Sequence, residues 1–267
     1  MKPPIRLERI FLMMIRKHPF FAFFFAFLTC LLLSANKGLA QAPAPAPGEA
    51  RLSLSEVVER LTERNAARAA ALAGYRSRRT YRLDYKGIPS NMHAELVVDL
   101  KYSAPATEEF KVVSQTGSKW LGDLVLKRLL ESDRESHDDK NRDAVQITSR
   151  NYNFTMLDSQ GSAEGCSYVL GVEPKIPSKF LFRGRIWVDD KDFAVCRIEA
   201  EPAKNPSFWI KKTEIHHAFA KVGDFWLPAE NTSVSHIRFD GNATLTIKYG
   251  AYEIESAHAL NMHSPEP

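Results

Sequence analysis

The sequence predicts an α+β fold, mainly antiparallel β, in which two long helices cover the concave face of a curved sheet of about ten strands. Three observations lead to this prediction. Two segments carry apolar residues at helical spacing, most of the chain after residue 79 alternates apolar and polar residues, and short turn sequences join the alternating segments. Strands joined by short turns lie antiparallel, and a sheet with that many strands has to curl.

The first predicted helix runs from Ser53 to Gly74. Ser53 and Glu56 have the spacing of a capping box, in which each side chain accepts a hydrogen bond from the other residue's backbone N–H. The second predicted helix covers residues 118–140. Its apolar side consists of Trp120, Leu121, Leu124, Val125 and Leu129.

The strand pattern is clearest in residues 92–104, where one face is apolar and the other is charged. Neighbouring residues of a strand point to opposite faces, so alternate residues share a face. The apolar face consists of Leu96, Val98, Leu100 and Tyr102, and the charged face of Glu95, Asp99 and Lys101. We expect this sheet to be half-buried.

Three acidic residues, Asp189, Asp190 and Asp192, separate two later strand segments. Oxygen-rich clusters can bind a hard cation, but Asp side chains also accept hydrogen bonds from the backbone of a turn. We expect these residues to form a hairpin turn.

Residues 1–40 have the three parts of a secretory signal peptide. Basic residues open the segment, an apolar run follows from Phe20 to Leu33, and Gly38-Leu39-Ala40 offers a cleavage site with small residues. We expect cleavage after Ala40 and a periplasmic product. A bilayer needs about 20 apolar residues, so a retained inner-membrane anchor is the alternative for this shorter run.

This leader changes the charge balance of the chain. The whole sequence has 36 Lys and Arg against 32 Asp and Glu, and its pI is near 8.9. Six of the basic residues and one acidic residue lie in residues 1–40, which leaves 30 basic and 31 acidic residues after export. A near-neutral protein gives no indication of nucleic-acid binding.

The exported part is expected to consist of a spacer, one domain and a tail. Residues 41–50 alternate Ala and Pro, a pattern that excludes a helix and predicts an extended spacer. Residues 51–260 are enough for a single domain with a large core. Residues 261–267 are expected to form a disordered tail.

Two cysteines, Cys166 and Cys196, remain after export, and an oxidising compartment would let them pair. The predicted strands place them on either side of a common neighbour, roughly 9–10 Å apart, which exceeds the reach of a disulfide. We therefore expect two separate, buried thiols, with a disulfide as the alternative.

The sequence contains no nucleophile elbow, no Gly-rich phosphate loop and no zinc-binding spacing. His216 and His217 are adjacent in a predicted strand, so their rings point to opposite faces and cannot clasp one metal ion. We expect a protein that is not an enzyme and that uses neither a metal nor a cofactor. A hydrolase is a hypothesis only if Ser, His and Asp side chains meet in the fold.

An apolar ligand cavity is expected where the curved sheet faces the second helix, because a helix that does not fill such a sheet leaves a concave apolar site. The predicted ligand-binding residues are Leu96, Val98, Leu100, Trp120, Leu124, Phe180, Phe182, Arg183, Arg185 and Trp187. Arg183 and Arg185 share one face of their strand. On a concave face they would hold a carboxylate, a phosphate or the carbonyl groups of a lid, whereas on a convex face they would be solvated charges.

Three stretches carry a family resemblance: FLFRGRIWVDDKDFAVCRIEAEP (Phe180 to Pro202), NPSFWIKKTEI (Asn205 to Ile215) and FWLPAENTSVSHIRFDGNATLTIKY (Phe225 to Tyr249). They resemble the outer-membrane lipoprotein-sorting carriers, whose LolA/LolB-like fold is shared with periplasmic sensors of the RseB type. The resemblance implies a half-open β-barrel of about eleven strands with helices that plug its mouth. It also implies that Arg183 or Arg185 holds a lid closed.

The function that this resemblance implies is binding without catalysis. The expected protein is a periplasmic carrier that holds lipid, the acyl chains of a lipoprotein or another apolar ligand for transport to the outer membrane. The alternative is a sensor or interaction protein of the same fold, which binds a protein partner, such as a membrane-associated one, at a sheet edge. The Ala/Pro spacer and a charged insertion at 131–143 depart from the carrier pattern.

Overall fold

The computed structural model describes residues 52–88, 90–105, 107–123, 129, 143–157, 166–178, 180–205, 207–238 and 241–256. The predicted signal peptide, the spacer, the C-terminal tail, Leu124 and most of the second predicted helix lie outside the described residues. The chain divides into two units, Met1–Leu52 and Ser53–Pro267, and all elements described below belong to the second unit.

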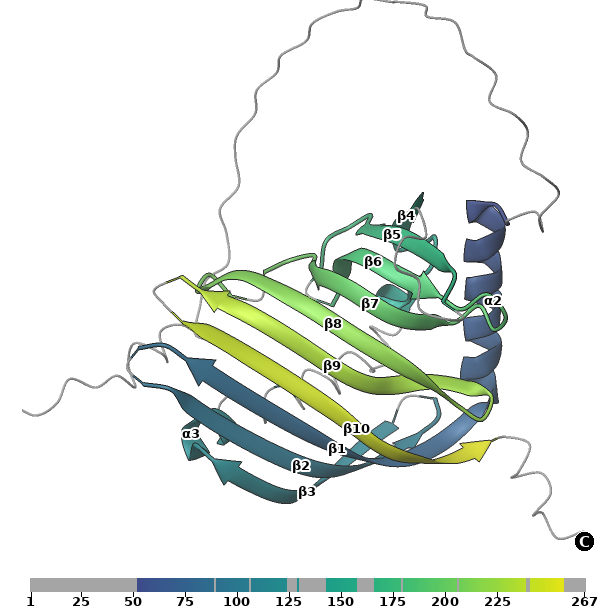
Figure 1. Ribbon diagram of the computed structural model, residues 1–267. Coiled ribbons are helices and arrows are strands. Elements are labelled where there is room, and N and C mark those ends of the chain that lie inside the picture. Colours follow the sequence, from purple (N-terminus) through teal and green to yellow (C-terminus); the bar gives the residue numbers. More distant parts are fainter. Residues whose placement is uncertain are drawn as a thin grey trace, which may run out of the picture. The chain divides into compact units, whose positions relative to one another are not determined.

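Ten strands form one curved antiparallel sheet (Figure 1). They are β1 (Leu72–Lys86), β2 (Met92–Ser103), β3 (Thr107–Gly117), β4 (Tyr152–Leu157), β5 (Tyr168–Pro174), β6 (Phe182–Val188), β7 (Val195–Pro202), β8 (Ile210–Val222), β9 (Phe225–Ile237) and β10 (Asn242–Ser256). Their order across the sheet is β3-β2-β1-β10-β9-β8-β7-β6-β5-β4. The predicted antiparallel sheet is therefore confirmed, and it is open, because β3 and β4 are its two edges.

The strand pairings link alternate residues across the sheet, with β-bulges in the β1–β10, β2–β3, β6–β7 and β8–β9 pairs. One row of paired residues crosses all ten strands: Met156, Leu170, Ile186, Ile198, His217, Asn231, Ile247, Tyr81, Leu96 and Gln115. We call the face that carries this row the inner face, because most of the buried side chains of the strands lie on it. The outer face carries the neighbouring row, which includes Trp187, Arg197, Lys248 and Val97.

Helix α2 (Leu54–Ala71) begins with the predicted capping box. The Glu56 backbone N–H donates to Ser53 Oγ at 3.4 Å, and the Ser53 backbone N–H donates to Glu56 Oε2 at 2.8 Å. The helix contacts β1 and β4. Three of its side chains are buried: Val57, Val58 and Leu61.

The helix ends at Ala71 and not at Gly74 as predicted, because β1 begins directly after it. Gly74 lies inside β1, where a Cβ atom would come within 2.7 Å of the Tyr102 carbonyl oxygen on β2. This glycine therefore permits the close approach of two strands.

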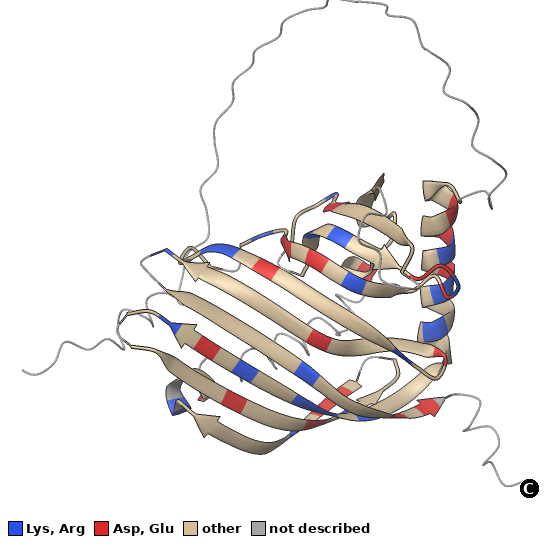
Figure 2. Cartoon of the chain, viewed as in Figure 1, with Lys and Arg blue, Asp and Glu red and all other residues tan. Residues whose placement is uncertain are grey.

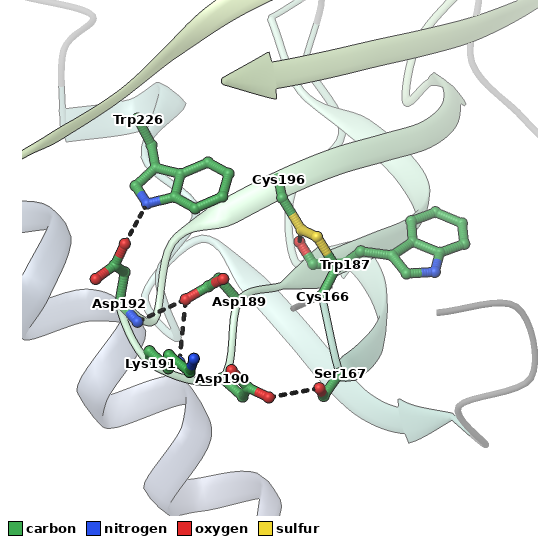
Figure 3. Close-up of a disulfide and its surroundings, with 9 residues drawn as sticks. All are labelled: Cys166, Ser167, Trp187, Asp189, Asp190, Lys191, Asp192, Cys196 and Trp226. Carbon is green, nitrogen blue, oxygen red and sulfur yellow. Dashed lines mark hydrogen bonds between the residues drawn. A yellow bond between two sulfur atoms is a disulfide. The ribbon is translucent and has the colours of Figure 1, made fainter. Parts of the chain in front are cut away.

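The predicted Asp-rich turn joins β6 to β7 (Figure 3). Asp189 Oδ1 accepts hydrogen bonds from the backbone N–H groups of Lys191 at 3.0 Å and Asp192 at 2.6 Å. Asp192 Oδ2 accepts one from Trp226 Nε1 at 2.8 Å and lies 2.6 Å from Lys221 Nζ. The Lys221 and Trp226 hydrogen bonds hold the pKa of the Asp192 carboxyl below its usual value. The turn prediction is thus confirmed, since these carboxylates satisfy groups of the fold.

The same turn fixes helix α2 to the sheet. The Arg68 guanidinium donates to the backbone carbonyl oxygens of Asp192 at 2.8 Å and Phe193 at 3.0 Å. About two turns earlier in the same helix, the Arg60 guanidinium lies 5.2 Å from the centre of the Phe193 ring. Two arginines of one helix thus contact one hairpin.

The second predicted helix is described at its start, as α3 (Lys119–Leu121). Ser118 caps it, since its Oγ accepts a hydrogen bond from the Leu121 backbone N–H at 3.4 Å. The rest of that helix lies outside the described residues and stays a prediction. Among the residues that the structure describes, no helix is long and apolar enough to span a membrane.

Cys166 and Cys196 form a disulfide, which contradicts the prediction of two separate thiols (Figure 3). Their Cα atoms are 6.5 Å apart, less than the separation of two residues held two strands apart. The prediction was wrong because Cys166 lies two residues before β5 begins, so strand spacing does not hold it away from β7.

Removing this disulfide should lower the free energy of unfolding by about 3–4 kcal/mol, because the bridge closes a loop of some thirty residues in the unfolded chain. The check is urea unfolding of the C166S/C196S variant beside the oxidised parent. Reduction of the parent should produce a similar loss, and equal midpoints for all three samples would contradict this account.

Candidate functional site

The inner face is solidly packed at β1 and β2. Alternate residues of these strands form one cluster with Leu121 of α3: Tyr81, Leu83, Ala94, Leu96, Val98 and Leu121. Leu96 and Val98 are 0% exposed, and Leu100, the next inner residue of β2, is 2% exposed. These three predicted ligand-binding residues therefore share one face, as the alternation of the sequence indicates.

The inner face is also largely closed at β5, β6 and β7, where five side chains are at most 5% exposed. They are Leu170, Val172, Ile186, Val188 and Ile198. The predicted residue Phe182 lies on this face at the start of β6, with its ring centre 5.6 Å from that of Tyr152. Phe180 lies in the turn that precedes this strand.

Between these two closed regions, the inner face of β8, β9 and β10 is partly exposed. The middle strand, β9, contributes small polar side chains there: Asn231, Ser233 and Ser235. Ser233 Oγ donates to Asn231 Oδ1 at 3.2 Å, and the hydroxyls of Ser235 and Thr213 are 2.9 Å apart.

Apolar side chains flank these polar groups on both neighbouring strands. Ile215 on β8 is paired with Ser233, and on the other side Leu245 and Ile247 of β10 are paired with Ser233 and Asn231. All three are partly exposed. We call this region the central stripe; it consists of Ile215, Asn231, Ser233, Ser235, Leu245 and Ile247.

A buried ion pair lies on the inner face beside the apolar cluster. Arg79 Nη2 on β1 is 3.4 Å from Glu108 Oε1 on β3, and the two side chains are 5% and 0% exposed. Arg79 also donates to the Tyr75 hydroxyl at 3.1 Å, and its guanidinium lies 5.1 Å from the centre of the Tyr249 ring. Sequence reasoning missed this pair, although Arg79 alternates in phase with the buried residues Tyr75 and Tyr81.

Replacing Arg79 by Met should destabilise the protein by about 3–5 kcal/mol, because the buried carboxylate of Glu108 would lose its partner. The double variant R79M/E108L should lose less stability than R79M alone, since it removes both buried charges. Urea unfolding of the parent, both single variants and the double variant gives the coupling energy. A double variant whose loss equals the sum of the single losses would show that the two residues are not coupled.

His217 and His216 lie on opposite faces of β8, as predicted. His217 is paired with Ile198 and Asn231 on the inner face, and its ring centre lies 4.3 Å from that of Phe219. His216 lies on the outer face, with Nδ1 3.9 Å from a Glu199 carboxylate oxygen. In the described ranges, no three metal-ligating side chains come together.

Burial, together with the charge of Arg79, lowers the pKa of His217 to about 4. The unfolded chain would take up this proton below about pH 6.5, whereas the folded protein resists it down to about pH 4. Between these values the unfolded state binds more protons, so the stability falls as the pH is lowered through this range.

Replacing His217 by Phe should therefore flatten the decrease of stability between about pH 6.5 and pH 4, by up to roughly 3 kcal/mol over the range. Phenylalanine keeps the stacking on Phe219. The measurement is the urea midpoint as a function of pH, with H216F as the matched control at the neighbouring, exposed position. Parallel pH profiles for H217F and the parent would refute the assignment.

Arg183, Arg185 and Trp187 lie on the outer face, because each alternates with an inner residue of β6. They cannot line one surface together with the predicted residues Leu96, Val98 and Leu100. The sequence left open which face of this strand carries the arginines, and the register of the sheet decides it. Trp120 has a described backbone but no described side chain, and Leu124 lies outside the described residues.

Basic and acidic residues are spread along the strands of the sheet (Figure 2). The two arginines of β6 are engaged with acidic side chains of the outer face: Arg183 Nε lies 3.2 Å from Glu173, and Arg185 Nη2 lies 2.8 Å from Glu199. The guanidinium of Arg185 also lies 5.4 Å from the centre of the Trp187 ring. A lid that covers the inner face could not contact either arginine; the arginine buried on the inner face is Arg79.

Two hollows of the described surface lie on the outer face. The first, about 660 Å³, is lined by charged side chains of β5 to β8, among them Glu173, Arg183, Arg185, Glu199 and Lys212. The second, about 620 Å³, lies over β1, β2, β3 and β10 and is lined by Arg78, Asp99 and Lys101 among others. Of the predicted ligand-binding residues, Arg183 and Arg185 line the first hollow and Leu100 the second, and charged residues are prominent in both linings.

No protein-family model matches this chain, and no curated protein does. Among solved structures, the chain is similar to an outer membrane lipoprotein-sorting protein domain from Vibrio parahaemolyticus, with 10% identity over 76% of this chain and 94% of that chain and a TM-score of 0.39. A LolA superfamily protein from Nitrosomonas europaea has 9% identity over 77% and 94% of the two chains and a TM-score of 0.34.

The MucA/MucB complex of Pseudomonas aeruginosa has 10% identity over 76% of this chain and 99% of that chain, with a TM-score of 0.23. Solved members of the superfamily that the sequence resembles are thus among the similar structures. With TM-scores below 0.5, these similarities say nothing of the ligand or the partner that this chain binds.

Proposed function

We propose that this protein is an exported, non-enzymatic binding protein that holds an acyl chain or another apolar ligand against the inner face of its sheet. The observation that carries the proposal is the central stripe. It is a partly exposed part of the inner face between two more fully buried regions, and its Leu245 and Ile247 pack against the apolar cluster of β1 and β2.

The composition of the central stripe suits an amphipathic ligand. Ser233 and Ser235 contribute small polar side chains on β9, and the apolar side chains of Leu245 and Ile247 lie on the neighbouring strand. Each methylene group removed from water there would contribute about 0.8 kcal/mol. The hydroxyl and amide groups of the stripe can bond a polar group of the same ligand.

Leu96, Val98, Leu100 and Phe182 support this surface from the neighbouring strands. Since Leu96 and Val98 are fully covered, they would contact a ligand only after the Leu121 side of the cluster moves away. Trp120 and Leu124, next to Leu121 in sequence, are proposed to belong to that movable cover. Arg183, Arg185 and Trp187 have no place in this proposal, because they lie on the other face.

Export is supported by two independent features. Residues 1–40 have the pattern of a signal peptide, and the Cys166–Cys196 disulfide belongs to an oxidising compartment such as the periplasm. Transport of the ligand to the outer membrane is the proposed use of such a protein.

Replacing Ser233 by Trp should weaken the binding of a fluorescently labelled fatty acid at least about tenfold. The indole would displace about two methylene groups of the probe from the central stripe. The matched control is T232W, the neighbouring residue of β9 on the outer face, which should bind like the parent. Fluorescence titration of delipidated protein gives both affinities. Equal loss in both variants, or no binding of the probe by the parent at high micromolar concentration, would refute the proposal.

A protein partner is the second candidate, favoured by the edge strand β3. This edge is eleven residues long, and it exposes Val112 and Val113 by 49% and 46%. An extended peptide can add a strand to such an edge. Protein recovered from the periplasm distinguishes the two candidates: extractable lipid supports the first, and a stoichiometric protein without lipid supports the second.

A further inference from the structure

Three large apolar side chains stand exposed at the tips of turns. Ile88 in the β1–β2 turn is 69% exposed, Ile176 in the β5–β6 turn is 78% exposed, and Phe208 in the β7–β8 turn is 71% exposed. Exposed side chains of this size have a cost in water that the packing of the sheet does not require.

All three turns lie at the same end of the sheet. Each strand is antiparallel to its neighbours, so the end of β1 lies beside the start of β10, and the alternation continues across the sheet to the end of β5. The β9–β10 turn and the residues before β4 lie at this end too. We call it the tip end; it is the left side of the sheet in Figure 1.

The tip end is basic, whereas the opposite end is acidic. The described residues of the tip-end turns and of the approach to β4 include four basic residues, Arg150, Lys175, Lys204 and Arg238, against one acidic residue, Asp143. The turns at the opposite end carry Asp189, Asp190, Asp192 and Asp224 against Lys191. A protein without appreciable net charge after export thus has two ends of opposite sign.

Hydrogen bonds to the backbone hold two of these tips in place. Arg238 Nε donates to the Phe208 carbonyl oxygen at 2.6 Å, while the Arg238 guanidinium lies 4.9 Å from the centre of the Phe208 ring. The Tyr85 hydroxyl donates to the Ile88 carbonyl oxygen at 2.7 Å. Because the backbone makes these bonds, the side chains of Ile88 and Phe208 remain at the surface.

We propose that the tip end docks the protein on the surface of an anionic lipid bilayer. Separate apolar tips with cations beside them suit a bilayer, in which each tip can insert among acyl chains while the cations meet lipid phosphates. The charge complementarity selects an anionic surface. A protein partner would instead be favoured by one continuous apolar patch, and here β10 and β9 separate the β1–β2 turn from the two turns that carry Ile176 and Phe208.

The test is flotation of the exported protein with vesicles of phosphatidylethanolamine and phosphatidylglycerol, beside vesicles of phosphatidylcholine alone. The parent should bind the anionic vesicles, and less so at high ionic strength. The variant I88S/I176S/F208S should bind at least about tenfold more weakly, since burial of one large apolar side chain is worth about a factor of ten. The matched control V112T/V113T removes exposed apolar groups from the edge strand and should bind like the parent.

Further variants test the contribution of charge and show whether a loss of binding results from a loss of folding. K175E/K204E should lose binding to the anionic vesicles, and each single tip variant should lose part of this binding while keeping the thermal unfolding midpoint of the parent. S233W should float like the parent, so that failure of the ligand proposal and failure of this one are distinguishable. Equal flotation of the parent and the triple tip variant, binding that ignores lipid charge, or capture of a protein in place of vesicles would overturn the proposal.

Discussion

The pairing of β1 with β10 is the constraint on which the rest of the structure depends. It joins the first strand to the last; without it, β1-β2-β3 and the meander from β4 to β10 would be two separate sheets. Its register places Tyr81 opposite Ile247 and Leu83 opposite Leu245, so that the row of inner residues through Tyr81 continues from β1 into β10. The inner face, with its apolar cluster, its ion pair and its central stripe, follows from that continuity.

A single open sheet has to cover its apolar side chains with few other elements, and the cover here is uneven. Arg68 fixes α2 to the β6–β7 turn, and Leu121 closes the cluster over β2. The central strands lie between these two covers, and β9 carries Ser233 and Ser235 on its inner face, which tolerate contact with water. The centre of the inner face is thus only partly covered, and its serine side chains can remain in contact with water, which makes it the candidate binding surface.

Local patterns in the sequence predict local structure well and relations between strands poorly. Alternation identifies the buried side of β2, and the spacing of Ser53 and Glu56 identifies the start of α2, because both signals lie within one element. Which face of the sheet Arg183 occupies depends on the register of every strand between β6 and β2. The disulfide depends on where Cys166 lies relative to the start of β5, a boundary that alternation fixes only to within a few residues. Arg79 was missed because an arginine within an apolar alternation is ordinarily assigned to the solvent side.

The acidic residues at one end of the sheet and the apolar tips at the other have different physical origins. At the acidic end, Asp189 bonds the backbone of its own turn and Asp192 bonds Trp226 and Lys221, so the stability of the fold accounts for these carboxylates. At the tip end, Ile88 and Phe208 are held by their carbonyl oxygens, and the exposure of their side chains adds nothing to stability. In an antiparallel sheet, turns at one end can change composition without disturbing the pairing between strands. A cost in exposed apolar surface that stability does not explain, repeated in three turns at one end, is therefore best explained by a surface that this end contacts.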